Sequence, residues 1–271
     1  MSKVRERPVL SVEYEEFGDP DAPLLLLVPP LGKSATSWVH QLPLFTETYH
    51  CIIPRPGHIG SHTEDPEALD FSVFAAKIWE LLDSLEVDKL HVAGWSTGTV
   101  IATELAVAEP SRLSSLSLYS PWLKTDTKLY ATFQMLIDIA TTSPDMTAVE
   151  TALNILQLSR QEINNIDNLP GFIERVIQEP HYPAPQDFIA YLKGCIQHDA
   201  SEDMHRITAP TLIIAGSSDQ FIDVSYSQEV ANSIPGATYI ELTEQATPYG
   251  ASIRESKEFN LVALEFIEDL S

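Results

Sequence analysis

Apolar runs alternate with amphipathic stretches along most of the chain, and this alternation predicts a parallel sheet covered by helices. Short unbroken apolar runs are typical of parallel strands that are buried on both faces. Apolar residues at helical spacing, such as Phe74, Ile78 and Leu81, are typical of helices that pack on a sheet. The predicted strands lie near residues 8–17, 24–28, 51–53, 90–93, 113–119, 210–216 and 237–242, and the predicted helices near 34–46, 71–85, 97–106, 226–234 and 255–267.

The alternation stops near Pro121 and resumes near residue 206. The intervening chain shows apolar residues at helical spacing, no strand pattern and several proline breaks, at Pro144, Pro170, Pro180, Pro183 and Pro185. Because strands alternate with helices on both sides of this segment, we predict an α/β fold with a doubly wound, mostly parallel sheet. The core comprises residues 1–121 and 206–271, and residues 122–205 form a helical insertion.

One turn carries the clearest chemical signal. Gly94-Trp95-Ser96-Thr97-Gly98 follows an apolar strand and opens a helix, and it fits the pattern G-x-S-x-G. A serine on such a turn projects its hydroxyl from the end of the sheet, and the N–H of Thr97 faces a developing oxyanion. The alternative is a serine in an ordinary turn between a strand and a helix. The strand before it and the helix after it favour a nucleophile elbow.

Charge and composition narrow the possible partners. The chain has 271 residues, 44% of them hydrophobic, which is enough for a large core. Its formal charge of −23, from 39 acidic and 16 basic residues, repels nucleic acid and anionic membranes, so we expect neither as a partner. The acidic residues either form a solvated surface that favours solubility or favour cationic ligands. The oligomeric state is not readable.

Targeting and cofactor signals are missing from the sequence. No apolar run approaches the roughly 20 residues of a membrane span, and MSKVRERPVL has no apolar signal-peptide region. Cys51 and Cys195 are far apart and lack metal-ligand spacing. No phosphate loop or dinucleotide fingerprint occurs. We therefore expect a soluble cytoplasmic protein that uses no metal and no cofactor.

Four stretches together resemble the α/β-hydrolase fold superfamily over nearly the whole chain. They are the Gly94–Gly98 turn, Leu31-Gly32, Pro56-Gly57-His58-Ile59-Gly60-Ser61 and Ala209-Pro210-Thr211-Leu212-Ile213-Ile214-Ala215-Gly216-Ser217-Ser218-Asp219. The resemblance implies that Ser96 is the nucleophile and Asp219 the triad acid. It implies that the Leu31 amide is the second oxyanion donor. It also implies that residues 122–205 form a helical cap over the pocket.

The triad histidine is missing from its usual place. The family order is serine, acid, histidine, but the last histidine here is His205, which precedes Asp219. Alignment from the closing helix puts Tyr249 at the histidine position. Two further departures accompany it. Pro29-Pro30 replaces the usual His-Gly, and Arg55 replaces an acid. Lys33, just after the oxyanion turn, is expected at the surface.

Three functional hypotheses remain open. In the first, the protein is a hydrolase with another base, for which His198 leads and His62 is possible, although His198 in this place is more often structural. His58 is expected to be structural. In the second, a lyase, cyclase or isomerase uses the same oxyanion hole with Tyr249 as proton donor. In the third, the protein only binds an apolar ligand. Intact Ser96 and Asp219 favour an enzyme.

The sequence does not identify the substrate. Aromatic side chains near the turn and in the insertion indicate a small apolar or aromatic molecule, such as an ester, a thioester or a ketone, although such residues often serve packing instead. The predicted substrate-binding residues are Leu31, Thr97, Trp95, Trp122 and His198. Tyr130, Phe133, Met135 and Trp38 are weaker candidates.

Overall fold

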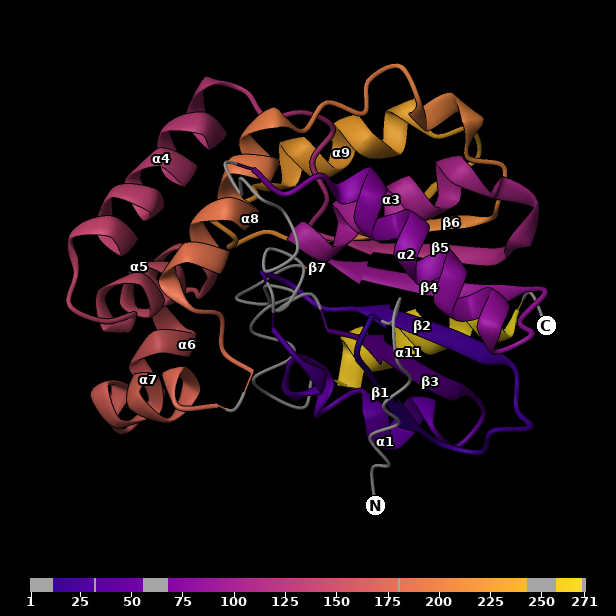
Figure 1. The fold of residues 1–271 in the computed structure, drawn as a ribbon, viewed down its shortest axis with the longest axis horizontal. Coiled ribbons are helices and arrows are strands. Elements are labelled where there is room, and N and C mark those ends of the chain that lie inside the picture. Colours follow the sequence, from indigo (N-terminus) through magenta and orange to yellow (C-terminus); the bar gives the residue numbers. More distant parts are fainter. Residues whose placement is uncertain (1–11, 32, 56–67, 180, 243–256, 270–271) are drawn as a thin grey trace.

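The predicted alternation of strands and helices forms a single seven-stranded sheet. The computed structural model describes residues 12–31, 33–55, 68–179, 181–242 and 257–269 (Figure 1). The strand order is β1-β3-β2-β4-β5-β6-β7, with β1 antiparallel to β3 and the other neighbours parallel. The doubly wound, mostly parallel sheet is therefore confirmed. The strands are β1 (Tyr14–Phe17), β2 (Leu24–Val28), β3 (His50–Pro54), β4 (Leu90–Trp95), β5 (Leu113–Tyr119), β6 (Thr211–Gly216) and β7 (Thr238–Leu242).

Alternate residues of the buried strands face two different helical layers. In β2, Leu26 and Val28 pack in the cluster that includes α2, α3 and α9, whereas Leu25 and Leu27 pack with α1 and α11. Figure 1 shows α2 and α3 in front of the sheet and α11 behind it. Burial on both faces explains why this strand reads as a continuous apolar run. The helices are α1 (Leu42–Phe45), α2 (Phe71–Ser84), α3 (Thr97–Ala108), α9 (Val224–Ser233) and α11 (Lys257–Glu268).

The segment predicted as helical over residues 34–46 is divided into two short helices. The 3₁₀ helix η1 (Ala35–Trp38) is capped by Ser34, whose side chain accepts from the Thr36 N–H. The one-turn α1 then begins, with Pro43 in its first turn. A proline has no backbone N–H and fits only the first turn of a helix, so one helix cannot run through this position.

Between β5 and β6 the chain forms helices, with no strand among the residues described there. These are α4 (Thr127–Thr142), α5 (Thr147–Gln157), α6 (Arg160–Asn164), α7 (Leu169–Ile177) and α8 (Pro185–Gln197), followed by the 3₁₀ helix η5 (Met204–Arg206). Figure 1 shows them gathered beside the sheet. Their buried apolar residues join the α2 and α3 cluster. We call residues 122–205 the cap.

The two ends of the cap meet each other. Lys124 and Asp199 form an isolated antiparallel bridge. The Thr125 N–H donates to the His198 carbonyl at 3.0 Å, and the Ala200 N–H donates to the Leu123 carbonyl at 3.0 Å. The cap thus enters and leaves the sheet through one short stem.

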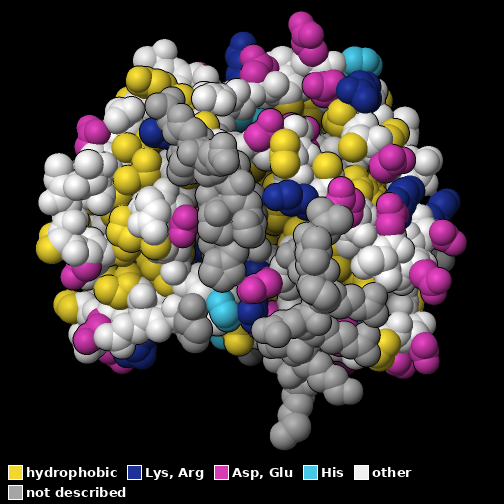
Figure 2. Space-filling view, viewed as in Figure 1, with side chains coloured by type: hydrophobic (Ala, Val, Ile, Leu, Met, Phe, Trp, Pro, Cys, Tyr) yellow, Lys and Arg dark blue, Asp and Glu magenta, His cyan; other side chains and the backbone are white. Residues whose placement is uncertain are grey.

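The surface carries mixed charge and some exposed apolar side chains. Figure 2 shows acidic side chains spread over one face and apolar side chains over the cap. Tyr130 and Met135 of α4 are about half exposed, as is Ile155 of α5. Within the described part of the chain, no helix is long and apolar enough to cross a membrane.

Candidate active site

Ser96 lies where β4 turns into α3, in a backbone conformation that non-glycine residues rarely adopt. Its φ is 49° and its ψ is −121°. The Ser96 N–H donates to the Tyr119 carbonyl at 2.8 Å, and the Ser96 carbonyl accepts from the Thr99 N–H at 2.8 Å. Such strain persists only where the surroundings enforce it, and it concentrates at functional sites. The turn has the geometry of a nucleophile elbow.

The two glycines of the motif permit close backbone contacts. A Cβ on Gly98 would lie 2.4 Å from the Val28 carbonyl oxygen and 2.7 Å from that of Pro29. A Cβ on Gly94 would lie 2.6 Å from the Gly98 carbonyl oxygen. No side chain fits at these distances, so the start of α3 lies directly against the loop after β2.

That loop brings Leu31 to Thr97. Leu31 has a φ of 36°, and its N–H donates to the Thr97 hydroxyl at 2.5 Å. The N–H expected to face an oxyanion is therefore already bonded to a side chain. Thr97 also lies beside the hydroxyl of Tyr191, from α8, and lowers the pKa of that phenol against the effect of burial, which raises it.

Asp219 lies in the loop after β6, where the resemblance placed the triad acid. Its Oδ1 accepts from the N–H groups of Phe221 at 2.9 Å and Ile222 at 3.0 Å. Its Oδ2 accepts from the Ser120 hydroxyl at 3.1 Å. The residue is only 7% exposed, and burial raises its pKa to about 7 even though these bonds and Lys128 lower it. The carboxyl is ordered by three donors and titrates near neutral pH.

Ser120 is a site residue that the sequence reasoning missed. It follows β5 directly, and Trp95 pairs with Tyr119 in the register of β4 and β5. The residues after them, Ser96 and Ser120, therefore leave adjacent strand ends. Both have positive φ, 49° and 51°. The sequence signal for Ser120 was its place directly after the strand that follows the elbow strand in the chain.

His198, the leading alternative base, belongs to the stem of the cap. Its Nε2 lies 3.3 Å from the Trp122 carbonyl oxygen, and its ring packs edge-on against the Trp122 ring. Burial lowers the pKa of His198 to about 4, so the ring is neutral at pH 7. Within the described part of the chain, its ring nitrogens hydrogen-bond to neither Ser96 nor Asp219.

The two predicted tryptophans lie in different environments. Trp122 packs against Phe133 of α4, and Phe133 packs against Phe221 beside Asp219. This aromatic row links the cap to the acid loop. Trp95 instead packs edge-on against Trp38, in the cluster behind the sheet. The Trp95 side chain is part of the core there.

The expectation that Lys33 is a surface side chain was wrong. Its side chain is 13% exposed, and its Nζ lies 3.2 Å from both carboxylate oxygens of Glu150 in α5. Arg55 pairs with acids of the first strand region, at 3.2 Å from Glu15 and 3.8 Å from Glu13. These ion pairs offset the free-energy cost of burying the charged groups of Lys33 and Arg55.

Several predicted residues fall outside the described part of the structure. These are Tyr249, His58 and His62. Their assignments remain predictions from the sequence. In the described segments no group of three or more His, Cys, Asp or Glu side chains could hold a metal ion.

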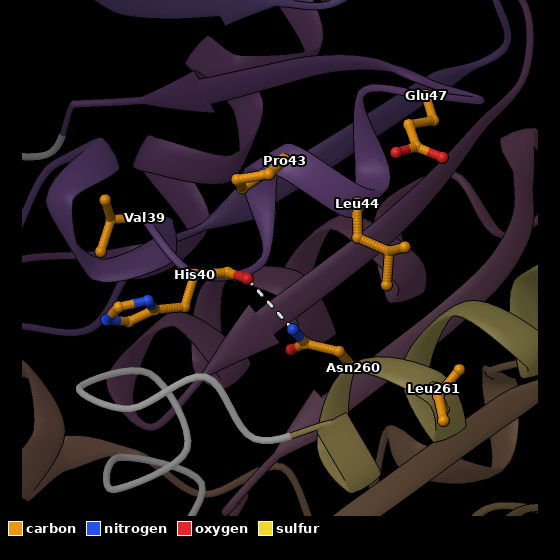
Figure 3. Close-up of a pocket in the computed structure, with 7 residues that line it drawn as sticks. All are labelled: Val39, His40, Pro43, Leu44, Glu47, Asn260 and Leu261. Carbon is orange, nitrogen blue, oxygen red and sulfur yellow. Dashed lines mark hydrogen bonds between the residues drawn. The ribbon is translucent and has the colours of Figure 1, made fainter.

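A groove of about 510 Å³ lies away from the elbow (Figure 3). One side is lined by Val39, His40, Pro43, Leu44 and Glu47, and the other by Asn260 and Leu261 of α11. The Asn260 side chain donates to the His40 carbonyl at 3.0 Å. No predicted site residue lines this groove.

Comparison with known proteins identifies relatives along the full chain. Residues 23–244 match the family described as "alpha/beta hydrolase fold". A relative from Stutzerimonas stutzeri (strain A1501), named "Putative carbamate hydrolase RutD", is 25% identical over 261 residues, which cover 95% of this chain and 97% of the relative.

Solved structures agree on the fold. A hydrolase from Pseudomonas aeruginosa PA01 is similar with a TM-score of 0.81 and 22% identity, over 94% of this chain and 93% of that one. The enol-lactonase from Burkholderia xenovorans LB400 is similar with a TM-score of 0.81 and 19% identity, over 94% of this chain and 95% of that one.

Proposed function

The chain belongs to the α/β hydrolase fold family and is an enzyme of that fold, and from this premise we propose that it hydrolyses a small apolar carboxylic acid derivative through Ser96. The observation that carries the proposal is the strained Ser96 turn, with φ at 49° between a buried strand and a helix. Leu31 and Thr97 lie on one side of this turn. Buried Asp219 follows a nearby strand of the same sheet.

The proposed chemistry is acyl transfer through a covalent intermediate. The Ser96 hydroxyl attacks the substrate carbonyl carbon and gives up its proton to a base. The oxyanion accepts from the Thr97 N–H and from the pair formed by the Leu31 N–H and the Thr97 hydroxyl. The leaving group departs with a proton, and water then releases the acid and restores Ser96.

Among the described residues Asp219 has the raised pKa that a proton acceptor needs, while the hydrogen bonds of its carboxyl are to Ser120, Phe221 and Ile222. A carboxyl with an ordinary pKa is a poor proton acceptor at neutral pH, whereas one with a pKa near 7 lies in the range suited to general base catalysis. Burial raises the pKa of Asp219 to about 7. His198 is less suited to the role, because burial lowers its pKa to about 4 and its Nε2 lies against the Trp122 carbonyl.

The names of the relatives support a substrate class. The Stutzerimonas relative is named for carbamate hydrolysis and the Burkholderia structure for enol-lactone hydrolysis. Esters, lactones and carbamates share an acyl carbon bound to a heteroatom leaving group. The aromatic row of Trp122, Phe133 and Phe221 favours a substrate with an apolar part. We propose a small ester, thioester, lactone or carbamate.

A second candidate function follows from the missing histidine. No histidine follows Asp219 in the sequence. A lyase, cyclase or isomerase needs oxyanion stabilisation and a proton donor but no acyl-enzyme, and Tyr249 is the donor that the alignment indicates. A phenol is mostly protonated at neutral pH and therefore suits this role.

One set of measurements separates the two functions. Wild-type protein, Ser96→Ala and His198→Gln are treated with a fluorophosphonate probe and with aryl esters, thioesters, lactones and carbamates in ¹⁸O-labelled water. Hydrolysis predicts labelling that Ser96→Ala abolishes and His198→Gln preserves, with ¹⁸O in the acid product. Turnover without ¹⁸O incorporation favours the second function. Labelling that survives Ser96→Ala contradicts the nucleophile assignment.

A further inference from the structure

A buried polar cluster joins the cap to the loop that carries Leu31. Lys33 Nζ lies 3.2 Å from each oxygen of the Glu150 carboxylate, and the Tyr182 hydroxyl donates to that carboxylate at 2.8 Å. The Asn154 side-chain amide donates to it at 3.1 Å. The Lys33 ammonium also lies 5.0 Å from the centroid of the Tyr182 ring. We call these four residues the Lys33 cluster.

Burial makes the members of the Lys33 cluster depend on one another. Glu150 is fully buried and the Lys33 side chain is 13% exposed. A buried carboxylate is tolerated only when it is paired and hydrogen-bonded, and removing one partner leaves an uncompensated charge. Glu150 therefore fixes the position of the Lys33 ammonium, and Glu150 lies in α5, a helix of the cap.

The loop after β2 is held from several sides. Leu31 is bonded to Thr97 at the start of α3, and the Lys33 N–H donates to the Pro30 carbonyl at 2.8 Å in a tight turn. Farther along, the Thr36 hydroxyl donates to the Glu179 carboxylate at 2.7 Å, a second bond between this loop and the cap. Leu31 has a φ of 36°. Strained residues keep their conformation only where such contacts enforce it.

We propose that Glu150 is a positioning residue, which holds the Leu31 amide in place through Lys33. The inference rests on the proposed function, in which that amide supports the Thr97 hydroxyl that donates to the oxyanion. Lys33 is two positions after Leu31, and its N–H donates to the carbonyl of Pro30, the residue before Leu31, at 2.8 Å. Docking of the cap through Glu150 thereby becomes a condition for a correctly placed oxyanion donor.

A matched set of variants tests the proposal. Glu150→Gln keeps the shape of the side chain and removes its charge. Lys33→Met removes the positive charge of the partner, whereas Lys33→Arg keeps it. Tyr226→Phe is the control, since it removes another buried contact between core and cap. There the Tyr226 hydroxyl lies 3.0 Å from the Asp126 carboxylate at the start of α4.

The first readout is steady-state hydrolysis of an aryl acetate. We expect Glu150→Gln and Lys33→Met to lower kcat by about ten- to a hundredfold, up to the cost of misplacing a catalytic group by about 1 Å, with KM within about threefold. Lys33→Arg should recover most of the rate, and Tyr226→Phe should keep it. Unchanged kcat in both Glu150→Gln and Lys33→Met, or an equal loss in Tyr226→Phe, overturns the proposal.

The second readout does not depend on activity. Amide hydrogen exchange of the peptide covering residues 29–38 should accelerate in Glu150→Gln and not in Tyr226→Phe, in samples that remain folded by circular dichroism. Unchanged exchange contradicts the positioning role whatever the enzyme does. Suppose instead that exchange accelerates in Glu150→Gln while fluorophosphonate labelling survives Ser96→Ala. That result supports the positioning of the loop by Glu150 and rejects the proposed function.

Discussion

The Leu31 N–H and the Thr97 hydroxyl form a hydrogen bond of 2.5 Å between the loop after β2 and the start of α3. Both residues are buried. The hydroxyl accepts from the amide and keeps its own hydrogen, so it can donate in turn. In the proposed function the oxyanion would therefore meet this hydroxyl, backed by the Leu31 amide, together with the Thr97 N–H.

Thr97→Val tests what this hydroxyl contributes. Valine has the same shape but leaves the buried Leu31 N–H without its acceptor, which costs about 1–3 kcal/mol. We expect the free energy of unfolding in urea to fall by that amount. Thr97→Ser, which keeps the hydroxyl, should lose much less. Equal losses in the two variants would show that packing of the methyl group, and not the hydrogen bond, matters.

Asp219 should make stability depend on pH. Below pH 4 its carboxyl is protonated in the folded and the unfolded chain. As the pH rises, the unfolded chain ionises first, because burial raises the folded pKa from 3.8 to about 7. Folded stability is therefore lost between about pH 4 and pH 7. The loss is at most roughly 4 kcal/mol, since one pKa unit corresponds to ~1.4 kcal/mol.

Asp219→Asn, which cannot ionise, provides the measurement. Relative to this variant, the wild-type free energy of unfolding should decrease from pH 4 to pH 8. Asp145→Asn is the matched control: hydrogen bonds from Thr147 lower the pKa of that exposed carboxyl, so its contribution to stability is lost only below about pH 4 and stays nearly constant from pH 4 to pH 8. If the free energy of unfolding of the wild type ran parallel to that of Asp219→Asn over this pH range, the pKa of Asp219 would not be raised in the folded protein.

Gly98→Ala should damage the fold around the elbow. The added Cβ would lie 2.4 Å from the Val28 carbonyl oxygen, and backbone atoms cannot move aside cheaply. Overpacking of this kind costs about 1–3 kcal/mol, and it would also displace the loop that carries Leu31. In Gly171→Ala the atoms nearest to the new Cβ belong to the Asn168 side chain, whose displacement costs the cap bond to the Gly171 N–H, about 1 kcal/mol, but moves no backbone. Thermal unfolding should therefore show a larger loss for Gly98→Ala.

Tyr249→His tests the departure from the family triad. If the alignment is right, a histidine there restores a base for Ser96, and aryl acetate hydrolysis should rise by about ten- to a thousandfold. This is less than the roughly 10⁶ that a complete triad contributes in a serine protease. Tyr249→Phe should impair the native reaction. Fast wild-type hydrolysis that Tyr249→Phe leaves intact would make Tyr249 a bystander.

Local patterns were sufficient to predict the sheet and the elbow. The predicted strands at residues 24–28 and 113–119 match β2 and β5 to the residue. The signal is strongest for β2, which is buried on both faces and apolar throughout. The Ser96 turn could be predicted because its close backbone contacts require glycine at positions 94 and 98. The position of Asp219 in the loop after β6 was predicted from the family resemblance.

Contacts between distant segments were not readable. Lys33 and Glu150 are 117 positions apart, and nothing local distinguishes a buried lysine from a solvated one. Ser120 required the register of β4 against β5. Trp95 was predicted to bind substrate because it neighbours Ser96, but in a strand alternate side chains point to opposite faces, and its face is the one covered by Trp38 and α11.

The stem at Lys124 and Asp199 has an evolutionary consequence. Because the excursion starts and finishes at one bridge, β5 and β6 remain hydrogen-bonded neighbours whatever lies between. The entropy of closing such a loop grows only with the logarithm of its length, so longer or shorter inserts are tolerated at that point. The segment beyond the stem can therefore be exchanged without breaking the pairing of β5 and β6, but an exchanged segment must again supply a partner for Lys33.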